Sequence, residues 1–308
     1  MSLVVLRSRV PPMPPRVSIL ISTYNSPEWL SLCLWGYAGQ TFRDFELIVA
    51  DDGSTLATAQ AIHRIRREAG LEIRHVWQEH RGFGKCAILN QAILVASADY
   101  LIFTDGDCIP RYDFVEQHVR LAEPGRFLSG GAVRLPRNVS RAIGSEDVVN
   151  RRATDPRWLA SRGLAAGRSR WTLAAGRRLA WLWDQATTTK ATFNGGNASV
   201  WKESVFRVNG FDETMGYGGE DRELGDRLAN LGLRGKQIRH RAVCVHLDHD
   251  RTYVDSATLE RNLALRRQTL RTRAAWTPHG IRKGFVSFEH YLESVREAAR
   301  AKRFRAAA

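Results

Sequence analysis

Short apolar segments alternate with helical patterns between residues 17 and 104, and this alternation most constrains the fold. Strands are predicted at 17–21, 45–50, 71–77 and 99–104. Helices are predicted between them, the first ending near Gly39 and the others covering 56–69 and 83–97. Such alternation indicates βαβ units and a parallel sheet. The chain is therefore expected to be an α/β protein.

A polar pair follows three of these strands. The pairs are Thr23 and Asn25, Asp51 and Asp52, and Asp105 and Asp107. Ligands of parallel sheets bind beyond the carboxyl ends of the strands, so the three pairs are expected to converge at one edge. This convergence is the main functional prediction that the residue pattern supports without any family resemblance.

The Asp105-Gly106-Asp107 sequence is typical of a divalent-cation site. Mg²⁺ and Mn²⁺ prefer a few oxygen ligands and leave positions for phosphate and water. Aspartates also cap turns, so the motif alone does not establish a metal site. His246 is a candidate further ligand, since imidazole suits Mn²⁺ better than Mg²⁺, although a structural histidine is the alternative. A zinc site built from His246, Asp248, His249 and Asp250 is disfavoured.

The second half of the chain contains a glycine-rich turn followed by acids. A helix is predicted from Glu220 to Leu231, and Asp221 lies in its first turn. These acids either stabilise the helix N-terminus or include a general base at the edge of a cleft. One strand is predicted over 237–250, and a basic helical region is predicted from Ser256 onward.

The excess positive charge is confined to two segments. The 308 residues include 46 Lys+Arg and 32 Asp+Glu, which gives +14. Residues 134–190 account for +8 and residues 255–308 for +7, while the remainder is nearly neutral. A basic balance indicates an anionic partner, although a basic run is also compatible with a solvated face. Within the first segment, 168–184 mixes arginines with three tryptophans, which suits either an anionic membrane surface or packing on the body.

Cysteine usage and hydropathy favour a reduced, cytoplasmic location. The four cysteines form no C-x-x-C pair, and no apolar stretch approaches a membrane span. The N-terminus reaches arginine and prolines too early for a secretory signal, so residues 1–15 are expected to be a disordered lead-in. The inner face of the membrane is considered as a peripheral location, and the oligomeric state stays open.

Several motifs together resemble the family-2 glycosyltransferases. The matching blocks are VSILISTYNSPEWL, IVADDGST, RGFGKCAILNQA and FTDGDCIP. The block that begins GGNASVW and runs through GYGGED resembles the acceptor side of β-1,4-galactosyltransferases and of bacterial chondroitin-type polymerase modules. The resemblance covers roughly 16–133 and 191–275.

This resemblance implies a GT-A fold with a mixed, mostly parallel sheet flanked by helices. Residues 16–133 would form the nucleotide-sugar half and 191–254 the acceptor half, separated by a basic Arg/Trp-rich insertion at 134–190 and followed by a basic helical region at 255–308. The implied reaction is an inverting, metal-dependent transfer from a UDP-sugar to a hydroxyl of a glycan or lipid-linked acceptor. Mn²⁺ or Mg²⁺ would assist it, and nucleic acid is not expected as a partner.

The resemblance also implies roles for particular residues. Asp221 would be the base and Glu220 would help hold the acceptor, while Asp107 and His246 would bind the metal. The donor would contact Thr23, Tyr24, Asn25, Asp52, Arg81, Lys85, Asp105 and Gly196, with Asp52 reading uracil and Asp105 facing the ribose. Many relatives have an arginine where this chain has Leu89, so Lys85 or Arg81 is expected to contact the diphosphate instead.

Two other functions are compatible with parts of the pattern. A sugar nucleotidyltransferase would use a related α/β sheet, but it usually has a glycine-rich basic loop after the first strand, and STYNSPEWL lacks one. A basic nucleic-acid-binding protein would use the positive segments, but the predicted acidic cleft would repel a phosphate backbone. DNA retention at physiological salt would distinguish this second alternative.

Overall fold

The computed structural model describes residues 17–250 and 254–307. The lead-in expected at 1–15 lies outside these residues. The first half contains β1 Val17–Thr23, α1 Pro27–Ala38, β2 Phe45–Asp51, α2 Leu56–Ala69, β3 Ile73–Trp77, α3 Lys85–Val95, β4 Tyr100–Asp105, β5 Cys108–Pro110, α4 Phe114–Leu121, β6 Arg126–Ser129 and β7 Gly131–Arg134. The strands and helices predicted between residues 17 and 104 are therefore confirmed.

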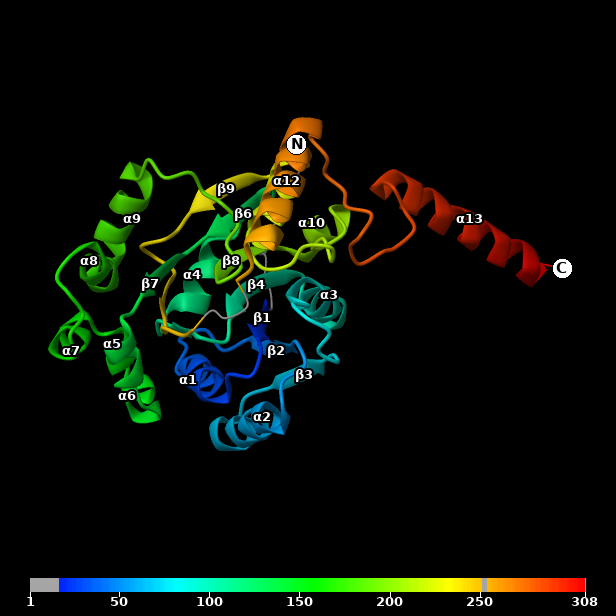
Figure 1. The fold of residues 1–308 in the computed structure, drawn as a ribbon. Coiled ribbons are helices and arrows are strands. Elements are labelled where there is room, and N and C mark those ends of the chain that lie inside the picture. Colours follow the sequence, from blue (N-terminus) through cyan, green and yellow to red (C-terminus); the bar gives the residue numbers. More distant parts are fainter. Residues whose placement is uncertain (1–16, 251–253, 308) are drawn as a thin grey trace, which may run out of the picture.

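The second half of the chain contains the remaining helices and strands. Its elements are α5 Arg137–Arg141, α6 Ser145–Val149, the 3₁₀ turn η1 Arg152–Thr154, α7 Pro156–Ser161, α8 Arg168–Ala174, α9 Arg177–Ala186, β8 Asn197–Trp201, α10 Lys202–Arg207, α11 Glu220–Asn230, β9 Arg234–Gln237, β10 Val243–His246, α12 Ser256–Thr272 and α13 Phe288–Ala307. Figure 1 shows α5 to α9 gathered on one side of the molecule and α13 projecting from the other.

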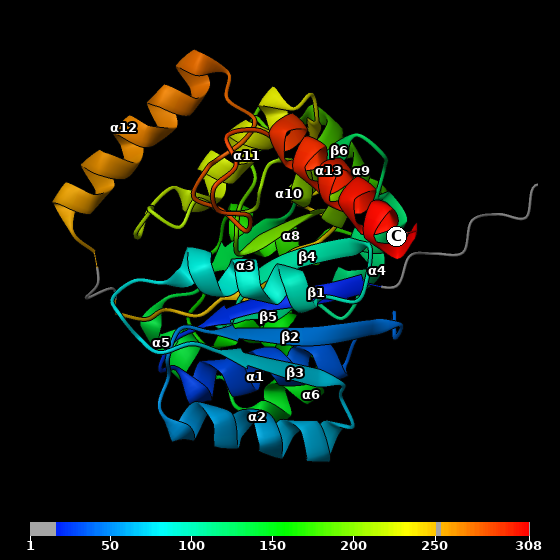
Figure 2. The same cartoon turned by 90° about the vertical axis from the view of Figure 1, so that its right-hand side faces the viewer.

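A seven-stranded sheet in the order β3-β2-β1-β4-β8-β6-β9 forms the centre of the fold. The first four strands are parallel, and β8 enters antiparallel between β4 and β6. Because successive side chains of a strand point to opposite faces, β1 buries Ile19 against α1 and α2 and Leu20 against α3. Figure 2 shows these helices on opposite faces of the sheet. The predicted mostly parallel α/β architecture is confirmed.

A second sheet, in the order β5-β10-β7, carries the segment 134–190. Val139, Ile143 and Leu159 of this segment pack with Val243 and Val245 of β10 in one buried cluster. The segment is therefore a helical layer packed on the small sheet. Its short helices account for its irregular hydrophobic pattern in the sequence.

The single strand predicted over 237–250 is wrong. β9 ends at Gln237 and β10 begins at Val243, and the two strands belong to different sheets. The turn between them is held by Asp184 of α9, whose carboxylate accepts hydrogen bonds from the His240 backbone at 3.0 Å and from Arg241 Nε at 2.6 Å. A contact that spans more than fifty residues leaves no local signal in the sequence.

The helical region predicted from Ser256 onward is interrupted. α12 ends at Thr272, and the chain is not helical again until Phe288. Asn209 holds the intervening segment, because its Nδ2 donates to the carbonyls of Thr277 and Arg282 at 2.7 and 2.9 Å. None of the described helices combines the length and the apolar character needed to cross a bilayer.

A buried histidine joins α4 to β8. His118 Nε2 lies 2.9 Å from Asn197 Oδ1, and its Nδ1 lies 2.7 Å from Ser199 Oγ. Burial lowers the pKa of His118 to about 4, although the contact with Asn197 opposes this effect. The unfolded chain, with a histidine pKa near 6.5, takes up a proton first as the pH falls. Stability is therefore expected to be lost between about pH 6.5 and pH 4.

The predicted contribution of His118 is about 2 kcal/mol of lost unfolding free energy between pH 7 and pH 5. Urea denaturation of the wild type and of His118→Gln at both pH values measures it. The variant should be less stable at pH 7 and should show a smaller pH dependence. An unchanged pH dependence in the variant would contradict this assignment.

Candidate active site

A cavity of about 1280 Å³ opens at the carboxyl ends of β1, β2 and β4. The polar pairs predicted to converge there do so, except that Asp51 is turned away to bind His75 and the Ser54 backbone. The predicted site residues that line the cavity are Thr23, Tyr24, Asn25, Asp52, Lys85, Asp105, Asp107, Gly196, Glu220, Asp221 and His246. The cavity therefore has one wall at the ends of β1, β2 and β4, which also includes His246 of β10, and another wall at the start of α11.

Arg81 is the predicted site residue that lies apart from this group. It is not among the described residues that line the cavity, and its guanidinium pairs with Glu79 at 2.7 Å on the exposed surface. Lys85, at the start of α3, lies inside the cavity. Of the two residues expected to take the place of the missing arginine, only Lys85 is positioned there.

The end of the cavity near Tyr24 is built by contacts between the ends of β1 and β2. Asn25 adopts a left-handed backbone conformation with φ 46°, and its Oδ1 accepts a hydrogen bond from Thr55 N at 2.9 Å. The rings of Tyr24 and His80 stack with centroids 4.3 Å apart. Tyr24 is partly exposed and presents an aromatic face to the cavity. His80 could not be singled out from the sequence, because its place in the cavity depends on this stacking.

Asp52 is buried beside this aromatic pair. Its carboxylate accepts hydrogen bonds from Gln78 Nε2 and Gly84 N, both at 2.7 Å. Burial raises the pKa of Asp52, although these two donors oppose the effect. Each carboxylate oxygen keeps a further lone pair for a ligand, so Asp52 can accept a hydrogen bond from an N–H of a bound base.

Lys85 links the two walls of the cavity electrostatically. Its Nζ lies 2.8 Å from Asp105 Oδ1 and 3.8 Å from Glu220 Oε1. Burial alone would lower the pKa of Lys85, but the two carboxylates raise it well above its usual value. Ser22 Oγ donates to the same Asp105 oxygen at 2.7 Å. The cavity therefore contains a fixed ammonium group at the junction of its two walls.

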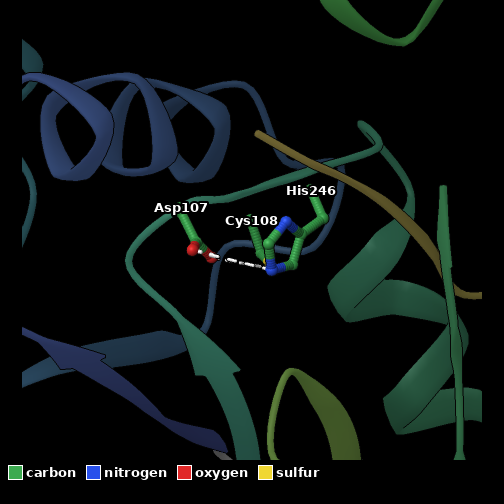
Figure 3. A group of neighbouring side chains, drawn as sticks. All are labelled: Asp107, Cys108 and His246. Carbon is green, nitrogen blue, oxygen red and sulfur yellow. Dashed lines mark hydrogen bonds and ion pairs between the residues drawn. The ribbon is translucent and has the colours of Figure 1, made fainter. Parts of the chain in front are cut away.

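Asp107, Cys108 and His246 form a group of metal-ligating side chains (Figure 3). His246 Nε2 lies 3.6 Å from Asp107 Oδ2, and His249 Nε2 lies closer, at 2.9 Å from the same oxygen. The two imidazoles stack with centroids 5.7 Å apart. One carboxylate and two imidazoles fit Mn²⁺, whereas the soft Cys108 sulfur does not suit a hard cation. The donor set therefore fits the expected divalent metal.

The position of His249 was not predicted as part of a manganese site. The sequence placed it only in a disfavoured zinc cluster, whereas the structure brings it to the Asp107 carboxylate. His246 is the last residue of β10, and His249 follows it by three residues. This spacing of two histidines is the signal that the sequence contained. The path of the chain after β10 then brings both imidazoles to Asp107.

Glu220 and Asp221 begin α11 on the opposite wall. Glu220 is buried, its Oε2 accepts a hydrogen bond from Gly218 N at 3.0 Å, and burial raises its pKa. Asp221 is more open, and its Oδ2 accepts a hydrogen bond from Gly195 N at 2.9 Å. The two carboxylates therefore face different environments, with Asp221 the more accessible from the cavity.

Two family models match successive parts of the chain. Residues 18–158 match glycosyl transferase family 2, and residues 185–250 match the N-terminal domain of galactosyltransferase. The first match continues past residue 133, where the sequence analysis ended its resemblance, and includes α5 and α6.

Curated relatives of the chain are also glycosyltransferases. A validoxylamine A glucosyltransferase of Streptomyces hygroscopicus subsp. limoneus is 30% identical over 269 residues, which are 80% of this chain and 56% of that protein. Escherichia coli chondroitin synthase is 27% identical over 234 residues, which are 72% of this chain and 33% of the synthase. The chain thus spans about half the length of the first of these relatives, and a third of the second.

Solved structures share the fold. The mannosyltransferase PcManGT of Pyrobaculum calidifontis, in complex with GDP-Man and Mn²⁺, has a TM-score of 0.54 and 21% identity, and covers 93% of this chain and 66% of its own. Residues 1–349 of S. aureus TarS, in complex with UDP-GlcNAc, have a TM-score of 0.59 and 15% identity, and cover 84% and 66%. With both glycosyltransferase models matched in order along the chain, the protein is related to the glycosyltransferases of family 2 and has the GT-A fold.

Proposed function

We propose that the protein is a metal-dependent, inverting glycosyltransferase that moves a sugar from a UDP-sugar to a hydroxyl of a glycan or lipid-linked acceptor. The observation that carries the proposal is one cavity with two chemically different walls. One wall presents Asp52, Asp105 and Asp107 beside histidines, and the other presents Glu220 and Asp221. A direct displacement needs the acceptor hydroxyl and the leaving diphosphate on opposite sides of the anomeric carbon, and a cavity lined by both groups of residues can hold donor and acceptor together.

The donor is proposed to lie along the ends of β1, β2 and β4. The base would stack on Tyr24 and donate an N–H to Asp52, the ribose would contact Asp105, and Thr23, Asn25 and Gly196 would line the same pocket. Lys85 would contact the diphosphate. A divalent cation held by Asp107, His246 and His249 would supply positive charge that stabilises the leaving UDP. The TarS structure, which holds UDP-GlcNAc, supports a nucleotide-sugar donor.

Asp221 is proposed to be the general base. It would take the proton from the acceptor hydroxyl while the oxygen attacks the anomeric carbon and the bond to the diphosphate breaks, so that UDP leaves with its electron pair. Attack from the face opposite the leaving group inverts the anomeric centre, and one carboxylate suffices. Glu220, buried behind Asp221, would hold the acceptor.

Release of UDP from a panel of UDP-sugars, in Mn²⁺, in Mg²⁺ and in EDTA, tests the reaction class. We expect one UDP-sugar to be turned over with either cation, and turnover to stop in EDTA. GDP-mannose is the matched comparison, since PcManGT was solved with this donor. Turnover of GDP-mannose without any UDP-sugar would overturn the uracil assignment and leave the reaction class intact.

The acceptor is proposed to be a surface glycan or lipid-linked sugar at the inner face of the membrane, with the protein bound peripherally. Support comes from the +8 of residues 134–190 and from Trp171 and Trp181, which are 65% and 49% exposed on α8 and α9. We also propose that residues 16–133 form the nucleotide-sugar half and residues 191–254 the acceptor half. The basic insertion and the basic C-terminal region would then lie outside these two halves. In a flotation assay at low salt, the protein should rise with anionic liposomes. Absence of flotation would refute the proposed membrane contact.

A further inference from the structure

One face of α12 forms a wall of the cavity. Leu259, Asn262, Leu263 and Arg266 line it, and their spacing places them on one side of the helix. α12 packs against α11, whose N-terminus carries Glu220 and Asp221. The sequence treated α12 as the start of a basic tail, whereas the structure makes it part of the site.

Asn262 is the buried member of this face. Only 1% of its surface is exposed, and its Nδ2 donates to the carbonyls of Gly216, Tyr217 and Gly218 at 2.9, 3.2 and 3.1 Å. Among the residues that the structure describes, its Oδ1 has no hydrogen-bond partner. An orphaned buried acceptor costs stability, so the amide is not explained by stability alone. The contribution of this side chain to the structure is made by its N–H groups, which donate hydrogen bonds to three successive carbonyls.

The loop that Asn262 holds leads directly into the two acids. Gly218 N donates to Glu220 Oε2, and Gly219 precedes the first residue of α11. The loop also lies close to α12, since a Cβ at Gly218 would come within 2.3 Å of Leu259, and the Gly218 φ of 108° disfavours any other residue. Helix and loop are therefore fitted to each other, with Asn262 at the centre of the contact.

We propose that Asn262 is a positioning residue, which fixes the loop Gly216–Gly219 and through it the Glu220–Asp221 pair for reaction with the acceptor. The inference rests on the proposed function. Asn262 acts through the loop, so its replacement should slow sugar transfer without weakening the binding of the nucleotide. Misplacing a catalytic group by about 1 Å costs as much as about 10²-fold in rate.

A second asparagine provides a matched control. Asn230 Nδ2 donates to the carbonyls of Thr269 and Ala274 at 3.1 and 2.8 Å. It joins the same two helices, but at the end of α11 opposite to Glu220. Asn230→Ala therefore removes the same kind of amide-to-carbonyl bond from the contact between α11 and α12, without touching the loop.

The test compares Asn262→Ala, Asn262→Asp and Asn230→Ala. Both Asn262 variants should lower kcat for transfer by about 10- to 100-fold, with UDP affinity in Mn²⁺ within about twofold of the wild type. The aspartate keeps the shape of asparagine but has no N–H to donate, so it should not rescue. Hydrogen exchange at 216–221 should be faster in both, and unchanged in Asn230→Ala.

Equal losses of activity in Asn262→Ala and Asn230→Ala would reduce Asn262 to a structural contact. Unchanged hydrogen exchange at 216–221 in Asn262→Ala would overturn the positioning role. If Asn262→Ala does not fold, Asn262→Ser, whose hydroxyl can donate to one carbonyl, replaces it with a smaller expected loss. A wild type that turns over no sugar nucleotide would refute the proposed function, while hydrogen exchange would still test the contact with the loop.

Discussion

Replacing Asp221 by asparagine is expected to lower the rate of sugar transfer by about 10²–10⁴-fold, the usual cost of removing a proton-transfer group. The amide has the same shape and its oxygen can still accept the hydrogen bond from Gly195 N, so the fold and the donor site should be retained. It cannot take a proton from the acceptor hydroxyl. Steady-state transfer kinetics with the best UDP-sugar, together with UDP affinity in Mn²⁺, measure the two properties separately.

Glu220→Gln is the matched comparison for this prediction. Burial raises the pKa of Glu220, but the side chain is buried and its Oε2 already accepts a hydrogen bond from Gly218 N. We expect its main effect on the acceptor KM. A larger loss of kcat in Glu220→Gln than in Asp221→Asn would make Glu220 the general base and Asp221 the residue that holds the acceptor.

Replacing Asp107 by alanine is expected to abolish metal-dependent binding of UDP and to lower transfer by more than about 100-fold. Asp107 supplies the only carboxylate of the Asp107–His246–His249 group, and a mutation in the outer shell of a metal site already costs about 10- to 100-fold. The melting temperature with UDP, measured with and without Mn²⁺, reports binding independently of turnover.

Asp99→Ala is the control at the other end of β4. Asp99 is exposed just before Tyr100, remote from the strand end that carries Asp105. Its removal should leave the Mn²⁺-dependent shift intact. If Asp107→Ala keeps this shift, the metal is not bound where we place it. His246→Ala and His249→Ala should each weaken the shift, because both imidazoles face the same carboxylate oxygen.

The first half of the fold could be predicted from the sequence because its signals are local. β2, for example, contains the uninterrupted apolar run Leu47–Ala50 and is followed by turn residues. Parallel pairing then fixes which strand ends meet, so the convergence of Asn25, Asp52 and Asp107 needed no structure.

The rest depended on contacts between distant segments. The turn between β9 and β10 exists because Asp184 binds His240 and Arg241. His249 enters the metal group because of the path of the chain after β10, and Asn262 enters the site because α12 folds back over α11. The contacts of Asp184 and Asn262 have no periodic or spaced signature in the sequence, and the spacing of His246 and His249 alone does not show that both lie at Asp107. For the same reason the sequence left both Lys85 and Arg81 as candidates.

Calorimetric titration of the wild type with UDP, with and without Mn²⁺, tests the central claim most directly. We propose that Asp107 holds a divalent cation beside the bound nucleotide, so UDP should bind with a 1:1 stoichiometry and much more tightly when Mn²⁺ is present. GDP should bind more weakly under the same conditions. Folded protein that binds no UDP, or binds it equally well without a divalent cation, would contradict the account.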